Sequence, residues 1–126
     1  MIQPNQYELH KRVTYDRLIN HGFDQYGRHF IIRKWLYKHF IYVELEIVLE
    51  EERPILLYKV YNYNTKQYYT PFYHEEERIN NIVYDEMVAN YNRYMDGLCA
   101  CGILWRKGFR ATPFHSRLKR CHRGRR

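Results

Sequence analysis

Residues 40–49 read FIYVELEIVL, and this stretch decides the fold class. Large aliphatic side chains occupy every second position from residue 41 to residue 49, and a tyrosine and two glutamates lie between them. Successive side chains of a β-strand point to opposite faces of a sheet, so this alternation predicts a strand with one buried and one solvated face. The buried set is Ile41, Val43, Leu45, Ile47 and Leu49, and the solvated set includes Tyr42, Glu44 and Glu46.

Three neighbouring stretches extend this strand into a sheet. Residues 28–37 (RHFIIRKWLY) and 55–63 (ILLYKVYNY) are rich in aromatic and aliphatic side chains, which favours strands, although the register of the first is ambiguous. Residues 67–72 form a short further strand. Polar turn sequences separate the stretches, so we expect an antiparallel meander of three to four strands.

Helices are predicted before and after the meander in the sequence. Residues 7–21 have helical spacing, with Thr14 placed as the N-cap if the helix starts late and Gly22 as the C-terminal cap. Residues 74–98 predict a long helix, whose first turn carries the glutamates that complement the helix dipole. Its apolar stripe is expected at Ile79, Ile82, Val83, Met87, Asn90, Tyr94 and Leu98. The fold class is therefore α+β, with both helices on one face of the sheet and the other face open.

Charge divides the 126 residues into two parts. Residues 1–104 carry 12 Lys and Arg against 14 Asp and Glu, whereas residues 105–126 carry nine Lys and Arg and no acid. The second part has few large aliphatic side chains and cannot bury enough apolar surface to fold alone. We therefore predict one α+β domain over residues 1–104 and an Arg-rich C-terminal arm over residues 105–126.

Composition also limits the class of protein. No apolar run is long enough to span a membrane, and the opening MIQPNQYELH lacks the basic and then apolar layout of a signal peptide. The three cysteines all follow residue 98, so they do not form the disulfide framework of a small secreted fold. We expect a reducing, intracellular location, namely the cytoplasm of a host cell.

Four stretches carry a resemblance to a known family. They are RLINHGF, HFIIRKWLYKHFIYVELEIVL, LYKVYNYNTKQYY and INNIVYDEMVANYNRYMDGL, which together span about residues 12–98. This pattern resembles small proteins of Gram-positive bacteria and their phages in or near the MmcQ/YjbR group. The resemblance implies a CyaY-like α+β sandwich, and it implies DNA binding as one possible role. The arm departs from that pattern.

Tyrosines mark a predicted protein interface on the open face. Tyrosine gives a large contact area at low entropic cost and is enriched at interfaces. The alternative is that 14 tyrosines reflect only the codon usage of an A/T-rich gene. The predicted interface residues are Tyr42, Glu44, Glu46, Tyr61, Tyr63 and Tyr69.

The arm predicts contact with nucleic acid. Guanidinium groups pair with phosphates and stack on bases, as do the aromatic rings interleaved with them. A solubilising tail, a tail for an acidic protein, or read-through sequence are the alternatives. The predicted contact residues are Arg106, Lys107, Arg110, Arg117, Lys119, Arg120, Arg123, Arg125 and Arg126.

Two metal sites are conceivable. Cysteine and histidine ligands near the C-terminus suffice in number for a structural zinc ion, although their spacing is unusual; they are Cys99, Cys101, His115, Cys121 and His122. The acidic groups 50–52 and 75–77 offer Mg²⁺ ligands for a nuclease, but a turn and a helix start explain them more simply.

The chain has no recognised catalytic motif, so we expect a binding protein and no enzyme. The leading hypothesis is a phage or mobile-element protein that engages a nucleic-acid-containing complex and inhibits it by occupancy. By analogy, the target is a host-defence nuclease such as a CRISPR effector with its guide RNA. The alternatives are an MmcQ/YjbR-like DNA-binding protein and, from another class, a metal-dependent nuclease.

Overall fold

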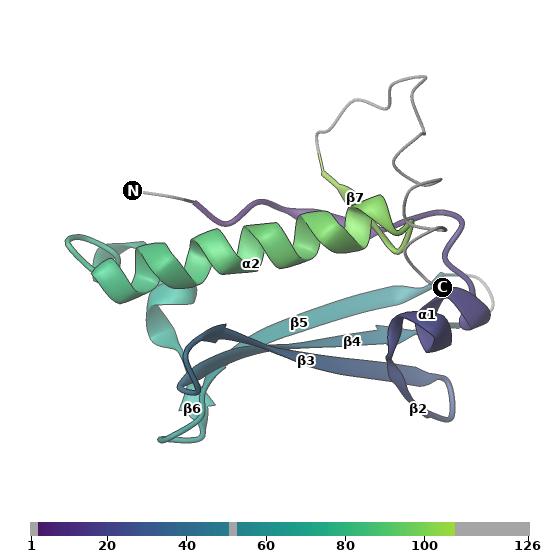
Figure 1. The fold of residues 1–126 in the computed structure, drawn as a ribbon, viewed down its shortest axis with the longest axis horizontal. Helices are drawn as coiled ribbons and strands as arrows, with labels where there is room; N and C mark the ends of the chain where they lie inside the picture. The colour runs from purple at the N-terminus through teal and green to yellow at the C-terminus, as the bar shows by residue number, and fades with distance from the viewer. Residues whose placement is uncertain (1–2, 51–52, 108–126) are drawn as a thin grey trace.

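The computed structural model of the chain describes residues 3–50 and 53–107 and has an α+β fold (Figure 1). A five-stranded antiparallel sheet, a two-stranded sheet, one short helix and one long helix make up this part of the chain. The elements are β1 (Tyr7–Leu9), α1 (Tyr15–His21), β2 (Asp24–Tyr26), β3 (His29–Tyr37), β4 (Ile41–Val48), β5 (Ile55–Asn62), β6 (Gln67–Tyr68), η1 (Thr70–Phe72), η2 (Glu75–Glu77), α2 (Ile82–Ala100) and β7 (Leu104–Arg106).

Strand β4 lies at the centre of the large sheet, whose strand order is β2-β3-β4-β5-β6. The side chains of Ile41, Val43, Leu45 and Ile47 are at most 2% exposed, which confirms the alternation predicted from residues 40–49. The meander itself is also confirmed, because each strand pairs antiparallel with the next along the chain.

The large sheet has more strands than the three to four expected. The unpredicted strand β2 is only three residues long and forms a hairpin with β3 through Gly27, which has a φ of 64°. Strand β6 is shorter than expected, because a 3₁₀ turn begins at Thr70, and Pro71 within that turn has no N–H to donate to a neighbouring strand.

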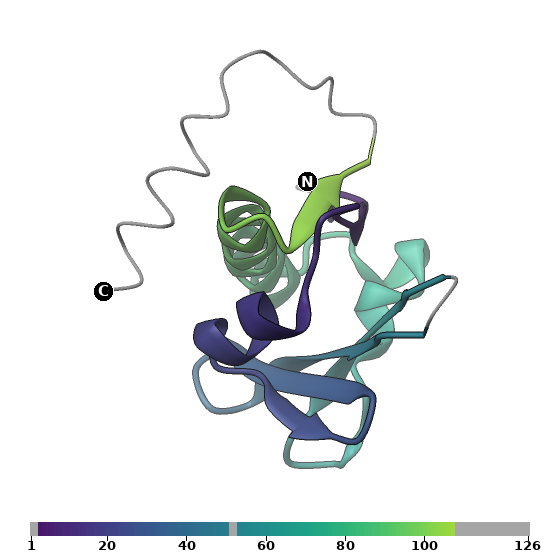
Figure 2. The ribbon, with the colours of Figure 1, turned by 90° about the vertical axis from the view of Figure 1, so that its right-hand side faces the viewer.

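One face of the sheet is covered by α2 together with the small sheet of β1 and β7 (Figures 1 and 2). Both helices pack on this side of the sheet, as expected, because Leu18 of α1 belongs to the same buried core as the inner side chains of α2. Helix α1 lies at the end of the sheet, where Leu18 is fully buried and the Tyr15 ring meets Phe30 edge to face at 5.2 Å.

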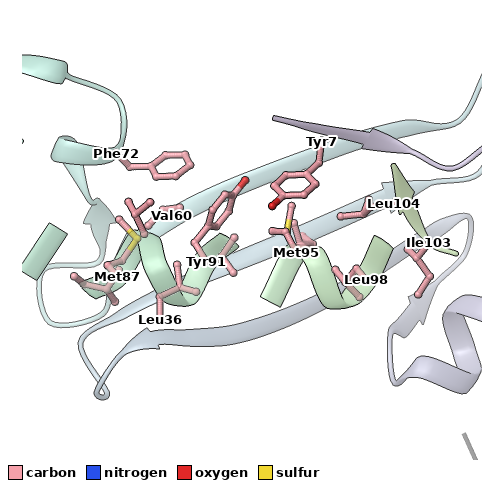
Figure 3. Packing of buried hydrophobic residues seen from close by; sticks show 14 of the residues in the cluster. Tyr7, Leu36, Val60, Phe72, Met87, Tyr91, Met95, Leu98, Ile103 and Leu104 are labelled. Atoms are coloured by element: carbon pink, nitrogen blue, oxygen red, sulfur yellow. The ribbon is translucent and has the colours of Figure 1, made fainter. Parts of the chain in front are cut away.

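The core lies between the inner face of the sheet and the covering layer (Figure 3). Buried side chains of α2 follow a helical stripe rotated from the predicted one, because Ile79 and Ile82 are 69% and 81% exposed. The observed stripe is Tyr84, Met87, Val88, Tyr91, Met95 and Leu98.

Helix α2 also starts later than predicted. Asn80 has a φ of 56°, and the Oδ1 of Asn81 accepts a hydrogen bond from the backbone N–H of Tyr84 at 3.0 Å. The helix therefore starts after a residue in the left-handed conformation, and Asn81 caps its N-terminus. The three glutamates therefore form a separate 3₁₀ turn ahead of α2.

Residues 7–21 are only partly helical. Tyr7 and Leu9 pair with Arg106 and Leu104, so this segment extends as a strand before α1 begins. The late start follows the predicted cap, because Thr14 Oγ1 accepts from the N–H of Arg17 at 3.2 Å. Gly22 ends the helix with a φ of 112°, as predicted.

Arg78 is the buried charged residue of the described chain, with 8% exposure. Its guanidinium donates to the carbonyls of Pro71 and Phe72 at 2.8 and 2.7 Å and to Gln3 Oε1 at 3.0 Å. The group also lies 5.1 Å from the centre of the Tyr84 ring. These contacts tie the two 3₁₀ turns to α2.

Within residues 3–50 and 53–107, the helices are too short or too polar to cross a membrane.

Candidate functional site

The candidate site is the face of the large sheet that α2 does not cover (Figure 1). On β4 this face presents Tyr42, Glu44 and Glu46, which are partly exposed and alternate with buried aliphatic side chains. Leu57, the neighbour of Glu46 on β5, is 42% exposed. The described residues thus leave a broad sheet surface in contact with solvent.

An aromatic ladder crosses this face, with one ring from each of the strands β3, β4, β5 and β6. Ring centres are separated by 5.7 Å for Trp35 and Tyr42, 5.3 Å for Tyr42 and Tyr61, and 5.1 Å for Tyr61 and Tyr68. The last pair is stacked, with an interplanar angle of 18°. The strand register positions these rings, because Tyr42 lies opposite Tyr61, and Tyr61 lies opposite Tyr68. Such cross-strand aromatic pairs stabilise a sheet.

Further rings extend the ladder at both ends. Tyr63 and His39 contact Trp35 edge to face, at 5.5 and 5.1 Å between ring centres. Tyr73 contacts Tyr68 at 5.5 Å, and its hydroxyl accepts from the N–H of Val60 at 3.0 Å. The result is a continuous aromatic surface in which neighbouring rings hold one another in place.

Charged pairs lie next to the ladder on the same face. Arg33 Nε donates to Glu44 Oε1 at 2.8 Å, and this hydrogen bond raises the pKa of the arginine. His29 Nδ1 and Glu46 Oε2 are 2.5 Å apart. Partial burial raises the pKa of Tyr61 to about 12, with a further contribution from Tyr68. The Tyr61 hydroxyl therefore stays protonated to a higher pH than that of a solvent-exposed tyrosine.

The structure places most of the predicted interface residues on this face. Tyr42, Glu44, Glu46 and Tyr61 belong to it, and Tyr63 lies at its end with 54% exposure. The placement of Tyr69 is wrong: its side chain is 9% exposed and belongs to the core.

Sequence reasoning missed Trp35, Tyr68 and Arg33 as members of the face. For Trp35 the sequence of β3 does not alternate, so its outward position follows from its pairing with Tyr42 on the solvated face of β4. For Tyr68 no local signal exists, since its position follows from the pairing of β6 with β5.

Only the first two residues of the predicted nucleic-acid contact lie in the described chain. Arg106 belongs to β7, opposite Tyr7, and the N–H of Lys107 donates to the carbonyl of Gln6 at 2.8 Å. The remaining predicted contacts lie outside the described residues; these are Arg110, Arg117, Lys119, Arg120, Arg123, Arg125 and Arg126.

The predicted zinc ligands are also divided. Cys99 and Cys101 lie at the C-terminal end of α2 and are half-buried. Burial, with the nearby Asp96 adding to it, raises the pKa of the Cys99 thiol to about 12. Zinc binds the thiolate, so binding there would require the metal to displace a firmly held proton. His115, Cys121 and His122 lie outside the described residues.

One exposed group among the described residues brings metal-ligand atoms together. His74, Glu76 and Glu77 offer ligand atoms within 4.8 Å of one another. Glu77 already accepts a hydrogen bond from the Thr70 hydroxyl at 2.7 Å, and Glu76 lies 3.8 Å from His74. Hydrogen bonding and charge pairing within the 3₁₀ turns account for this arrangement.

Searches against family models, curated proteins and solved structures found no match for this chain. The resemblance to the MmcQ/YjbR group therefore stays a prediction from sequence. The geometry of the open face is the evidence on which a function can be argued.

Proposed function

We propose that the protein is a binding protein that docks through the open face of its sheet onto a protein component of a larger target, without catalytic turnover. The observation that carries this proposal is the aromatic ladder, which is fixed in place yet uncovered. Tyr and Trp rings dominate binding energy at many protein interfaces, and rings that are already ordered lose little entropy on binding.

The arrangement of the rings favours a protein partner on this face. Tyr61 and Tyr68 stack on each other, and Tyr42 lies only 30° from the plane of Tyr61. Ring faces that already pack together are less available to stack on nucleobases, whereas their edges and hydroxyls remain suited to protein groups. The pairs beside the ladder, Arg33 with Glu44 and His29 with Glu46, add polar groups that would fix the orientation of a partner.

Nucleic acid is proposed for the arm, not for the sheet. Residues 105–126 contain nine Lys and Arg and no acid. Such a segment binds phosphate chains with strong salt dependence. A target that contains both protein and nucleic acid would engage both parts of the chain. A host-defence nuclease loaded with guide RNA, inhibited by occupancy, is the specific form of this proposal.

The arm is tested with the full chain and fluorescent single-stranded RNA and double-stranded DNA. Neutralising Arg117, Lys119, Arg120 and Arg123 to Gln should weaken binding strongly and flatten the dependence of affinity on salt, because fewer counterions are released. A matched control replaces Lys11, Arg12, Lys38 and Lys66 in the folded part. Equal losses in the two variants would contradict a dedicated role for the arm.

Occupancy is tested on guide-loaded CRISPR effector nucleases. Inhibition should be complete near one protein per effector and should leave RNA and protein intact on gels. Changing Glu44 and Glu46 to Lys should weaken inhibition while the circular dichroism spectrum is unchanged. Inhibition at sub-stoichiometric protein, or the appearance of cleaved RNA, would overturn occupancy in favour of an enzymatic activity.

A further inference from the structure

Strand β3 extends well beyond its neighbour β2. The β2–β3 pairing runs from Tyr26 opposite His29 to Asp24 opposite Ile31, whereas β3 continues to Tyr37. Figure 1 shows β2 beside only the α1 end of β3. Among residues 3–50 and 53–107, the sheet order therefore places no strand next to residues 32–37 on the side away from β4.

The hydrogen bonds between β3 and β4 show which residues of β3 point their backbone N–H and C=O groups toward β4 and which point them away. The N–H of Leu49 donates to the carbonyl of Arg28 at 3.0 Å, and this pair continues the register of Phe30 opposite Ile47. In an antiparallel pair the hydrogen-bonding residues alternate, so Phe30, Ile32 and Lys34 point their backbone groups toward β4, up to the register shift between Trp35 and Tyr37. The N–H and C=O groups of Arg33 and Trp35 point the opposite way, toward the unpaired side.

A hollow on the open face adjoins this edge. Its volume is about 240 Å³, and its lining residues are Arg33, Lys34, Trp35, Tyr42 and Tyr63. Trp35 is 40% exposed and stands at the edge of the sheet. A side chain of an added strand would enter this hollow and contact the indole.

Cations surround the same stretch of β3. Lys34 extends over the Tyr94 ring, with Nζ 5.8 Å from the ring centre, and Lys38 follows at the end of the strand. Arg93 is linked to the strand through Asn90, which accepts from Arg93 at 2.7 Å and donates to the Leu36 carbonyl at 2.7 Å.

Carboxylates partly offset this charge. Glu44 is held by Arg33, and Asp24 lies at the end of the paired region. Lys34, Lys38 and Arg93 are exposed and keep the edge positively charged along residues 34–38.

We propose that the edge of β3 binds an extended acidic segment of a partner protein, which joins the sheet as an additional strand. Exposed edges accept such strands through backbone hydrogen bonds, and side-chain hollows select the sequence. Here Arg33 and Trp35 supply the backbone groups, the hollow beside Trp35 takes an apolar side chain, and Lys34 and Arg93 attract carboxylates. This inference rests on the proposed function in that both require a protein partner, but it uses the edge of β3 and only the Trp35–Tyr42 end of the aromatic ladder.

Charge and backbone chemistry separate this occupant from its competitors. The charged side chains of the arm are all cations, and a second copy would bring the cations along residues 33–38 of two edges close together, so repulsion disfavours both. Nucleic acid would satisfy the cations, but it lacks the alternating N–H and C=O groups that pair with a strand edge.

The test combines amide hydrogen exchange by NMR with a synthetic peptide in which Glu alternates with Val and one central Val is replaced by Trp. In the free full-length protein, the amides of Arg33 and Trp35 should exchange faster than those of Ile32 and Lys34. Saturating peptide should slow exchange at Arg33 and Trp35 by roughly tenfold or more, because their N–H groups become hydrogen-bonded.

Matched variants isolate charge and backbone pairing. Lys34→Glu should weaken peptide binding roughly tenfold, a loss of about 1.4 kcal/mol, whereas Lys11→Glu in an exposed turn should not. Two further peptides carry N-methyl groups on alternate amides, one on the odd and the other on the even residues. Only the peptide whose methylated amides face β3 should lose binding. Replacing the glutamates of the unmethylated peptide with lysines should abolish binding.

Several results would overturn the proposal. They are failure of the peptide to bind, binding without protection of Arg33 and Trp35, or displacement of the peptide by oligo-dT with the same protection pattern. Tyr61→Ala distinguishes this inference from the proposed function, because it removes a ring of the ladder that does not line the hollow beside β3. Peptide binding should survive that substitution, and inhibition of a nucleoprotein target should weaken.

Discussion

The two faces of the five-stranded sheet are stabilised in different ways. On β4 the inner side chains of Val43, Leu45 and Ile47 are fully buried beneath α2 and the small sheet, whereas Tyr42 and Glu44 contact solvent. The inner face depends on close packing. On the outer face the side chains contact one another, through the aromatic ladder and the Arg33–Glu44 pair. A sheet face can therefore be ordered without a covering layer when its own side chains supply the contacts.

Tyr91→Ala should give the largest loss of stability. Tyr91 is fully buried in α2 and contacts Tyr7, Tyr58 and Phe72 through ring edges or tilted faces. Removing a large core ring leaves a cavity, and we expect the free energy of unfolding to fall by about 4 kcal/mol. Urea denaturation measures this. A loss near 1 kcal/mol would mean that the inner face is no more tightly packed than the outer one.

Arg78→Met should be the next most destabilising change. It leaves the carbonyls of Pro71 and Phe72 without their charged donor in a buried position, with an expected loss of about 3 kcal/mol. Arg12→Met, at an exposed position, is the control and should change the free energy of unfolding by less than about 0.5 kcal/mol. Equal effects would show that the buried guanidinium is not an anchor.

Alkaline pH should destabilise the fold through the buried ionisable groups of α2. Burial raises the pKa of Tyr94 and of Cys99 to about 12 and raises that of Tyr91 still further. The unfolded chain loses these protons at a lower pH, so stability is fully present below the unfolded pKa values and falls as pH rises from about 9 toward 12. Urea midpoints across this range measure the loss, and absorbance at 295 nm should show buried tyrosines ionising only on unfolding. Ionisation of every tyrosine near pH 10 in the folded state would contradict this burial.

Tyr61→Ala tests the outer face. It removes two ladder contacts, to Tyr42 and to Tyr68, and each cross-strand aromatic pair contributes roughly 0.2–1 kcal/mol. We expect the unfolding free energy to fall by about 1 kcal/mol, far less than for Tyr91. A loss as large as that of the core variant would show that the ladder holds the sheet together rather than forming a ready surface.

Arg33→Met should have the smallest effect. The side chain is 66% exposed, and exposed ion pairs contribute little because water and salt screen them. The change in unfolding free energy should stay within about 0.5 kcal/mol. A double-mutant cycle with Glu44→Gln should give a coupling energy within the same limit, because the two effects should be nearly additive. A strong coupling between the two residues would mean that this pair organises the face.

The sequence predicted those parts of the fold in which short-range pattern and burial agree. The alternation in β4 and the cap and stop of α1 at Thr14 and Gly22 are confirmed, because each depends on residues close together in the chain. Strands β1 and β7 were missed, since each has three residues and is defined by its pairing with the other across most of the chain. The start of α2 was misplaced because helical spacing continues through Ile79, and the turn at Asn80 is not visible in that spacing.

Residues of the candidate site were predicted where they belong to the alternating strand β4, and they were missed where their position depends on the pairing of strands. Tyr42, Glu44 and Glu46 followed directly from the alternation of β4. The ladder did not, because it requires the registers that bring Trp35 beside Tyr42 and Tyr68 beside Tyr61. Tyr69 was misplaced because β6 ends at residue 68, so the alternation of a strand no longer applies to it.

The pairing of β1 with β7 has a mechanical consequence. Tyr7 and Arg106 lie opposite each other, and the N–H of Lys107 donates to the carbonyl of Gln6, so residues 6 and 107 lie at the same end of this small sheet. A pulling force between residues 6 and 107 would load these hydrogen bonds one after another, as in a zipper, and not all at once in shear. Tension applied at residues 6 and 107 should therefore peel away the small sheet at low force and expose the inner side of β5 before the five-stranded sheet yields.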